Sequence, residues 1–318
     1  MQQQRSLTVI SEGFETSDQS NVSANLPELA VREFHDALHR HPEVAVAVAA
    51  IKALTTVIQH STAQTMHGLG KDLENAAAAL QRQNPTAISL KAGCELFLRY
   101  TTRSLLELEQ ADIGTAKRRL IERGVKFEHL STRARATIAE LGSRFIRNGA
   151  VVLLHGYSRV ALAVLQRARA AAFRSCNFSV VVTEGRPDNT GIRTSRALHD
   201  MDIPVTMVLD SGVGYCMERV DMVLLGAEAV VENGGVINKL GTFQIAVCAK
   251  AMNKPVYVAA ESYKFARIYP LNQRDLPVES KPLDFGPLLP PGVSVDNPSH
   301  LGVLTPAAVS DELIQLYS

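Results

Sequence analysis

The pattern of apolar residues changes near residue 150, and this change constrains the fold more than any other feature of the chain. Before it, apolar residues recur at helical spacing, so that Leu29, Phe34 and Leu38 share one helix face. After it, short apolar runs alternate with amphipathic helical patterns, which is typical of a parallel sheet with right-handed crossovers. The sequence therefore predicts an α/β protein. A mobile N-terminal tail (1–25) precedes an all-α domain (26–149) and a Rossmann-like, doubly wound parallel sheet (150–318).

The periodicity also predicts where the elements lie. In the first half it predicts helices at Ala45–Ile58, Lys71–Arg82, Gly93–Glu109 and Arg133–Arg147, with breaks at Gly68–Gly70 and Asn84-Pro85. In the second half it predicts strands at Val151–Leu154, Phe178–Thr183, Val205–Leu209, Met222–Leu225 and Pro255–Ala259. Helices are predicted at Val160–Phe173, Thr194–Asp200 and Phe243–Met252, with a last short one near Ser310–Tyr317.

Composition excludes several classes of function. The balance of 33 Lys+Arg against 32 Asp+Glu argues against a dedicated nucleic-acid binder. The four cysteines (Cys94, Cys176, Cys216 and Cys248) are scattered without a CxxC pair, which fits reduced thiols in the cytosol rather than disulfides or zinc. No signal peptide is recognisable, and the most apolar stretch, 44–58, is too short to cross a membrane. We expect a cytosolic protein without membrane or nucleic-acid contact.

Polar residues follow the predicted strands, and the segment Gly226–Thr242 reads as strand end, polar loop and helix N-terminus. The carboxyl ends of parallel strands converge at one edge of a sheet, where such folds bind ligands. A single polar loop after a strand is ordinary, whereas four such loops at one edge favour a ligand pocket. The candidate ligand residues are His155, Tyr157, Ser158, Arg159, Glu184, Arg186, Glu228, Asn233, Asn238, Lys239, Gly241 and Thr242. Because GxGxxG and GxxxxGK[ST] motifs are missing, a sugar phosphate fits better than a nucleotide, and no cofactor is expected.

Two further groups of residues invite a functional interpretation. His35 and His39 lie one helical turn apart with His41 nearby, but no HExxH or other ligand set accompanies them, so a solvated helix face is favoured over a metal site. A basic stretch extends from Lys117 to Arg135. The favoured interpretation of this stretch is an exposed helix face with paired charges, and RNA binding is the least favoured. A docking face for an acidic or phosphorylated protein ranks between the two.

Several motifs together carry a family resemblance over residues 26–277. They are His155–Val160, Val205–Asp210, Gly226–Thr242, Ala249–Pro255 and Tyr269–Gln273, supported more loosely by Cys94–Tyr100 and Leu120–Gly124. The chain resembles the alpha, beta and delta regulatory subunits of eukaryotic translation initiation factor 2B. Within that family the short N-terminal tail favours the alpha type, since the other two carry longer extensions.

The family is similar to the methylthioribose-1-phosphate and ribose-1,5-bisphosphate isomerases, and this similarity bears on catalysis. The isomerases use a cysteine and an aspartate where this chain has Gly156 and Glu228, and an arginine where it has Asn84. Aldose–ketose isomerisation needs a proton-transferring group within hydrogen-bond reach. Glycine supplies none, and the extra methylene of glutamate displaces its carboxylate by roughly 1.5 Å. The resemblance thus implies a non-catalytic subunit with an inherited phosphate pocket.

The resemblance also implies partners. It implies a homodimer through the Rossmann-like domain that joins the halves of a decamer with the beta, gamma, delta and epsilon subunits, of which gamma and epsilon carry out guanine-nucleotide exchange. It further implies contact between the helical domain and the phosphorylated alpha subunit of initiation factor 2, by which stress kinases inhibit exchange. Two alternatives stay open: a working sugar-phosphate isomerase, and a ligand sensor whose pocket stabilises the dimer.

Overall fold

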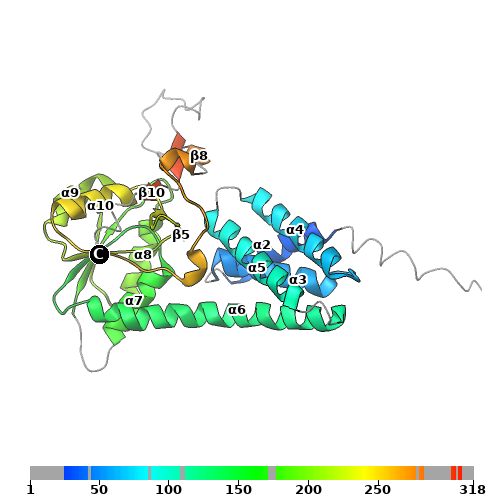
Figure 1. The fold of residues 1–318 in the computed structure, drawn as a ribbon. Helices are drawn as coiled ribbons and strands as arrows, with labels where there is room; N and C mark the ends of the chain where they lie inside the picture. Colours follow the sequence, from blue (N-terminus) through cyan, green and yellow to red (C-terminus); the bar gives the residue numbers. More distant parts are fainter. Residues whose placement is uncertain are drawn as a thin grey trace, which may run out of the picture.

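The computed structural model describes residues 25–41, 44–84, 87–107, 112–170, 177–276, 279–282, 302–305 and 307–309. The predicted tail therefore lies almost wholly outside the described residues, and the helix predicted near 310–317 lies outside them as well. In Figure 1 a helical part and a sheet-containing part lie side by side. The helical part consists of α2 (Leu26–Arg40), α3 (Val46–His60), α4 (Met66–Gln83), α5 (Ile88–Glu107) and α6 (Ile113–Gly142).

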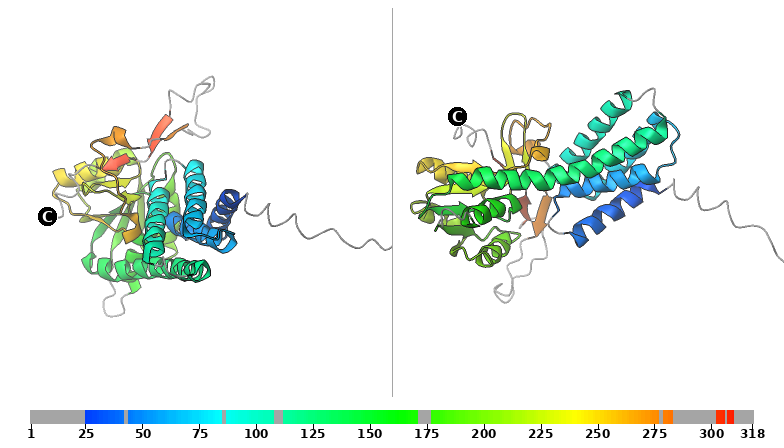
Figure 2. Two further views of the ribbon diagram at one scale, coloured as in Figure 1. Left: turned by 45° about the vertical axis from the view of Figure 1, so that its right-hand side comes forward. Right: turned by 90° about the horizontal axis from the view of Figure 1, so that it is seen from below.

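The long helix α6 joins the two parts. It contacts α3 in the helical part and α7 (Arg159–Ala170) in the sheet part. The right-hand view of Figure 2 shows it running along both. The sequence predicted only the last part of this helix, Arg133–Arg147, whereas the structure begins it at Ile113 and ends it at Gly142, before a 3₁₀ turn (η1, Ser143–Phe145).

The predicted break at Gly68–Gly70 is wrong, because α4 begins at Met66 and includes both glycines. The Thr65 side chain caps this helix by accepting a hydrogen bond from the Gly68 backbone N–H at 3.1 Å. Leu69 is fully buried in the core that α2, α3, α4 and α5 share. Burial of the apolar face outweighs the low helix propensity of two glycines, each worth about 1 kcal/mol.

The predicted parallel sheet is confirmed. Its described part has five strands in the order β3-β2-β1-β4-β7, and all of these neighbours are parallel. The strands are β1 (Val151–Leu154), β2 (Ser179–Thr183), β3 (Val205–Val208), β4 (Met222–Leu225) and β7 (Val256–Val258). Besides α7, the helices α8 (Thr190–His199), α9 (Val213–Met217) and α10 (Thr242–Ala251) connect them, and the 3₁₀ turn η2 (Asp210–Gly212) precedes α9. Two further 3₁₀ turns, η3 (Ser262–Lys264) and η4 (Gln273–Asp275), follow β7.

Alternate strand residues pack on opposite faces of this sheet. Val152 and Leu154 lie in one apolar core with residues of α7 and α8, whereas Leu153 lies in another with α9 and α10. Helices therefore cover both faces, which is why the strands read as continuous apolar runs. The chain moves outward from β1 to β3, then returns to place β4 on the other side of β1. The crevice at this reversal, between the carboxyl ends of β1 and β4, is the usual ligand position in such sheets.

The segment between β4 and α10 is more ordered than predicted. It contains two short antiparallel strands, β5 (Ala229–Val230) and β6 (Val236–Asn238), and β10 (Ala307–Val309) pairs with β6. A further antiparallel pair joins β8 (Glu279–Pro282) and β9 (Gly302–Thr305). The interpretation of 226–242 as a plain loop is therefore wrong, because the segment forms β5 and β6. The pairing partner β10 comes from a distant part of the chain, so local periodicity carries no trace of this pairing.

None of the helices in the described part of the chain combines the length and the apolar composition needed to cross a bilayer.

Candidate functional site

His155 lies at the centre of the strand-end loops and is buried. Its Nδ1 lies 2.6 Å from the Thr183 hydroxyl at the end of β2, and its Nε2 lies 2.6 Å from the Leu240 carbonyl oxygen before α10. A carbonyl only accepts hydrogen bonds, so Nε2 carries the proton and Nδ1 accepts from the hydroxyl. Burial lowers the pKa of His155, which keeps the ring neutral. The ring therefore ties β1, β2 and the α10 entrance together.

Asp210 fixes the loop after β2. Its two carboxylate oxygens accept hydrogen bonds from the backbone N–H groups of Gly185 (2.9 Å) and Arg186 (2.8 Å). One of these oxygens also lies 4.0 Å from His155 Nδ1. Within the loop, Arg186 Nε donates to Glu184 Oε2 at 3.3 Å. The loops after β1, β2 and β3 thus form one connected polar network.

Lys239 places a cation at the mouth of this network. Its Nζ pairs with Asp188 Oδ2 at 2.9 Å, and its side chain is 39% exposed. The lysine stem passes over Gly156, where an added Cβ would lie 3.4 Å from Lys239 Cδ and 3.5 Å from the Thr190 hydroxyl. The glycine therefore leaves room beside the lysine, and it brings no reactive group of its own.

Two hydroxyl groups at this edge, Thr190 Oγ1 and Thr242 Oγ1, are buried without a hydrogen-bond partner among the described residues. Thr190 begins α8 and Thr242 begins α10, so each stands beside the free N–H groups of a helix N-terminus. Gly241, which precedes α10, has a φ of 96° that favours glycine. Unpaired hydroxyls, helix N-termini and a lysine together suit an anionic ligand.

The structure brings together six of the predicted residues: His155, Glu184, Arg186, Lys239, Gly241 and Thr242. Four others contact neighbouring elements within the sheet part. Ser158 Oγ accepts from the Ala161 N–H, and Asn238 Nδ2 donates to the Gly226 carbonyl oxygen at 2.9 Å. Asn233 Nδ2 donates to the Pro270 carbonyl oxygen at 2.8 Å, and the Tyr157 ring lies 3.9 Å from the Arg193 guanidinium carbon.

Arg159 and Glu228 face the helical part instead. Arg159 Nη1 donates to the Val44 carbonyl oxygen at 2.5 Å. Glu228 Oε1 accepts from the Ser89 hydroxyl at 2.6 Å, in the first turn of α5. The carboxylate that the family resemblance matches to the isomerase aspartate is therefore engaged in a contact between the two parts.

Thr183, Thr190 and Asp210 were not among the candidate ligand residues, although Asp210 ends one of the motifs that carry the family resemblance. Thr183 is the last residue of β2, and Asp210 comes just after β3, so position at a strand end was a usable signal for both. Thr190 could be recognised only once the start of α8 was known, because the sequence placed that helix at Thr194.

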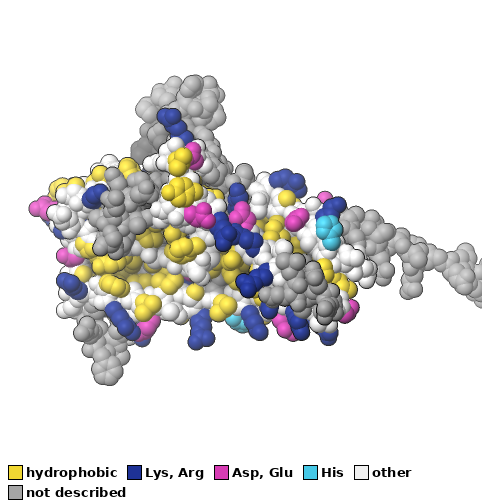
Figure 3. All heavy atoms as spheres, in the orientation of Figure 1, with side chains coloured by type: hydrophobic (Ala, Val, Ile, Leu, Met, Phe, Trp, Pro, Cys, Tyr) yellow, Lys and Arg dark blue, Asp and Glu magenta, His cyan; other side chains and the backbone are white. Residues whose placement is uncertain are grey.

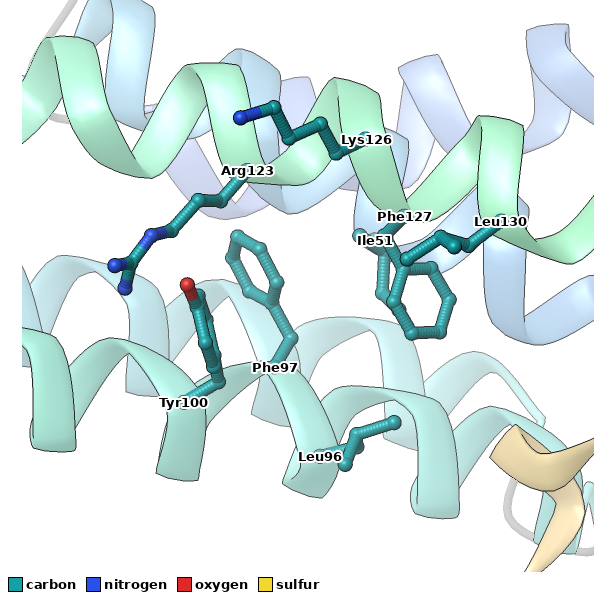
Figure 4. A pocket seen from close by; sticks show the side chains of 8 residues that line it. All are labelled: Ile51, Leu96, Phe97, Tyr100, Arg123, Lys126, Phe127 and Leu130. Carbon is teal, nitrogen blue, oxygen red and sulfur yellow. The ribbon is translucent and has the colours of Figure 1, made fainter.

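A separate hollow lies in the helical part, between α5 and α6 (Figure 4). It has a volume of about 330 Å³ and an apolar floor with basic side chains on α6. Its lining residues are Ile51, Leu96, Phe97, Tyr100, Arg123, Lys126, Phe127 and Leu130. The guanidinium carbon of Arg123 lies 4.9 Å from the centre of the Tyr100 ring. Part of the basic stretch recognised in the sequence therefore borders an apolar hollow.

The three histidines considered for metal binding lie on α2 (His35 and His39) and just after it (His41). Within the described ranges no three His, Cys, Asp or Glu side chains come together as metal ligands.

Comparison with known proteins places these features in context. The model of the initiation factor 2 subunit family (IF-2B) matches residues 39–307. The chain is 42% identical to the translation initiation factor eIF2B subunit alpha of Dictyostelium discoideum, over 90% of this chain and 96% of that protein. It is 33% identical to the subunit of the same name from Caenorhabditis elegans, over 91% and 99%. It is also 32% identical to the ribose 1,5-bisphosphate isomerase of Pyrococcus furiosus, over 86% and 83%.

Solved structures agree on the fold. A crystal structure of the Pyrococcus horikoshii translation initiation factor eIF-2B superimposes with a TM-score of 0.64 at 19% identity, covering 94% of both chains. A chain of the tetrameric eIF2B-beta2-delta2 complex from C. thermophilum superimposes with a TM-score of 0.66 at 20% identity, covering 78% of this chain and 81% of that one.

Proposed function

The chain belongs to the initiation factor 2 subunit family, and from that premise we propose that it is an alpha-type regulatory subunit of initiation factor 2B. That complex is the guanine-nucleotide exchange factor for initiation factor 2, and this subunit would act in the cytosol. The observation that carries the proposal is the similarity to two alpha subunits over nearly their whole length. The proposed role is to sense the phosphorylated alpha subunit of initiation factor 2 and to join the halves of the decamer.

The subunit is non-catalytic, and two local features supply the physical reason. Gly156 has no side chain to move a proton between neighbouring carbon atoms, and Glu228 is held by Ser89. A base must lie within hydrogen-bond reach of the proton that it removes. The family resemblance places Glu228 at an isomerase position, and its hydrogen bond from the Ser89 hydroxyl keeps this carboxylate from moving freely in the pocket.

The edge strand β3 supports a homodimer through the sheet part. It ends the sheet, and Met207 is 49% exposed on it. Leu209 follows the strand at 62% exposure, and Tyr215 on α9 is 80% exposed. In the view of Figure 3, hydrophobic side chains gather over the sheet-containing part. An exposed apolar patch beside a strand edge that pairs with no other described strand suits an interface between copies of the chain. Leu209→Asp should convert a dimer to a monomer in light scattering, and an unchanged mass would refute this interface.

The strand-end network supports binding of a sugar phosphate. The paired cation Lys239 and the unpartnered hydroxyls of Thr190 and Thr242 are the groups proposed to receive the phosphate. A panel of sugar phosphates in a thermal-shift assay tests this. A ligand present at 100 times its Kd should stabilise the folded chain by about 2.7 kcal/mol, whereas no shift with any of them argues against the pocket.

The experiment that tests the main proposal is co-purification of the tagged chain from its own cells. The beta, gamma, delta and epsilon subunits should come with it, and their absence would overturn the proposal. Purified complex should then bind the phosphorylated alpha subunit of initiation factor 2 more tightly than the unphosphorylated one. The hollow beside Arg123 and Lys126 is a candidate for that contact, because apolar and basic groups meet there.

The isomerase alternative rests on the similarity to the archaeal ribose 1,5-bisphosphate isomerases. Incubation with ribose-1,5-bisphosphate and with methylthioribose-1-phosphate distinguishes an active isomerase from a non-catalytic regulatory subunit. Turnover that Glu228→Ala abolishes would establish an active isomerase and refute the non-catalytic assignment.

A further inference from the structure

The contact between Glu228 and Ser89 joins two parts of the chain that are far apart in sequence. Glu228 Oε1 accepts from the Ser89 hydroxyl at 2.6 Å and from the Ser89 backbone N–H at 3.4 Å. Ser89 is the second residue of α5 and is 5% exposed. A carboxylate at a helix N-terminus interacts favourably with the helix dipole, and a hydrogen bond to a charged acceptor is stronger than a neutral one. The pair therefore anchors the start of α5.

Apolar packing surrounds this contact. Ile88 and Ala92 of α5 lie in one buried cluster with Ala229, Val231 and Ile237 of the small sheet. This cluster keeps water from much of the contact, so the charged hydrogen bond is weakened less by solvent than a surface pair would be. The first turn of α5 is consequently both packed and hydrogen-bonded against the segment that carries β5 and β6.

On its other side, the loop that carries Glu228 is packed against the loop that follows β1. Gly226 lies so close to Ser158 that an added Cβ would be 2.4 Å from Ser158 Oγ. The Gly226 carbonyl oxygen accepts from Asn238 at 2.9 Å, and the Ala227 carbonyl oxygen accepts from Lys264. A shift of the loop after β1 is thereby passed to residues 226–228, because close-packed groups have no free space to absorb it.

We infer that Glu228 is a latch that couples the strand-end loops around His155 to α5, and through α5 to the hollow in the helical part. The middle of α5 carries Leu96, Phe97 and Tyr100, which line that hollow. A helix of this length is about 30 Å long and moves largely as a rigid rod. A change at the phosphate-binding edge should therefore reach the hollow through the Glu228–Ser89 pair.

The first test is a double-mutant cycle read by amide hydrogen exchange in the full chain. Glu228→Ala and Ser89→Ala should each speed exchange in residues 88–100 about tenfold, as expected for loss of a charged hydrogen bond. The double variant should exchange no faster than the quicker single variant, because both remove the same interaction. Glu228→Gln, whose amide oxygen still accepts, should recover most of the protection.

Glu232→Ala is the matched control, since it removes an exposed carboxylate from the same segment. It should leave residues 88–100 unchanged. Unchanged exchange in β1 and β2 in every variant excludes general unfolding as the cause. Normal exchange of residues 88–100 in Glu228→Ala, or additive effects in the double variant, would overturn the latch.

The second test adds ribose 5-phosphate and rests on the proposed sugar-phosphate pocket. The ligand should slow exchange near 155–158 and 239–242 in both the native chain and Glu228→Ala, but in residues 88–100 only in the native chain. Equal protection of 88–100 in the two proteins would refute the coupling. If the ligand slows exchange in no segment of either protein, the result would count against the sugar-phosphate pocket alone. The double-mutant cycle would then still test whether Glu228 and Ser89 form the latch.

Discussion

Replacement of Gly241 by alanine tests the arrangement around His155 most directly. Gly241 precedes α10 with a φ of 96°, and an added Cβ would lie 2.8 Å from His155 Cε1. The ring cannot swing away at low cost, because both of its nitrogen atoms are held by hydrogen bonds of 2.6 Å. Gly241→Ala should therefore lower the free energy of unfolding for two separate reasons, backbone strain and a steric clash.

The two contributions can be sized separately. A left-handed backbone costs an alanine roughly 1–2 kcal/mol. Forcing an atom into a packed site costs about 1–3 kcal/mol more. The expected loss is thus about 2–5 kcal/mol. Gly149 is the matched control, because its φ is 82° but an added Cβ would meet no atom of the described residues within 4 Å. Gly149→Ala should lose only the backbone share, about 1–2 kcal/mol.

Urea unfolding of the variants measures the difference. In a His155→Ala background, which removes the ring, Gly241→Ala should cost no more than Gly149→Ala does in the native chain. If the two glycine variants lose the same stability in the native background, the ring does not press against α10. The proposed role of His155 as the tie between β1 and the α10 entrance would then be refuted.

Three other outcomes follow from single residues. Gly70→Ala should raise stability by about 0.5–1 kcal/mol in thermal unfolding, because alanine favours the helix and an added Cβ in α4 meets no described atom within 4 Å. A loss of stability in this variant would contradict the unbroken helix. Burial lowers the pKa of His155 in the folded chain, so below pH 6.5 the imidazole takes up a proton more readily in the unfolded chain. The stability of the fold should therefore decrease below pH 6.5, and the decrease should be smaller in His155→Gln. Burial raises the pKa of Cys94 to about 12, so iodoacetamide at pH 8 should spare Cys94 until denaturant is added, as peptide mass mapping can check.

The type and order of the main elements were predictable from periodicity. Apolar residues every three or four positions predicted the helices, and the short apolar runs after residue 150 predicted all five strands of the parallel sheet. The gathering of polar residues at one edge was predictable too, because parallel strands place their carboxyl ends together. The loops that carry His155, Glu184 and Arg186 meet there for that reason.

The direction of individual side chains was beyond reach of the sequence. Arg159 and Glu228 follow strand ends as the other candidates do. Arg159 nevertheless contacts Val44, and Glu228 contacts Ser89, both in the helical part. Each side chain takes the direction in which its charge finds hydrogen-bond partners, and those partners lie more than a hundred residues away in sequence. Periodicity determined which elements form and which loops meet. Only the packing of the two parts against each other decided which polar groups remain at the pocket and which join the halves of the chain.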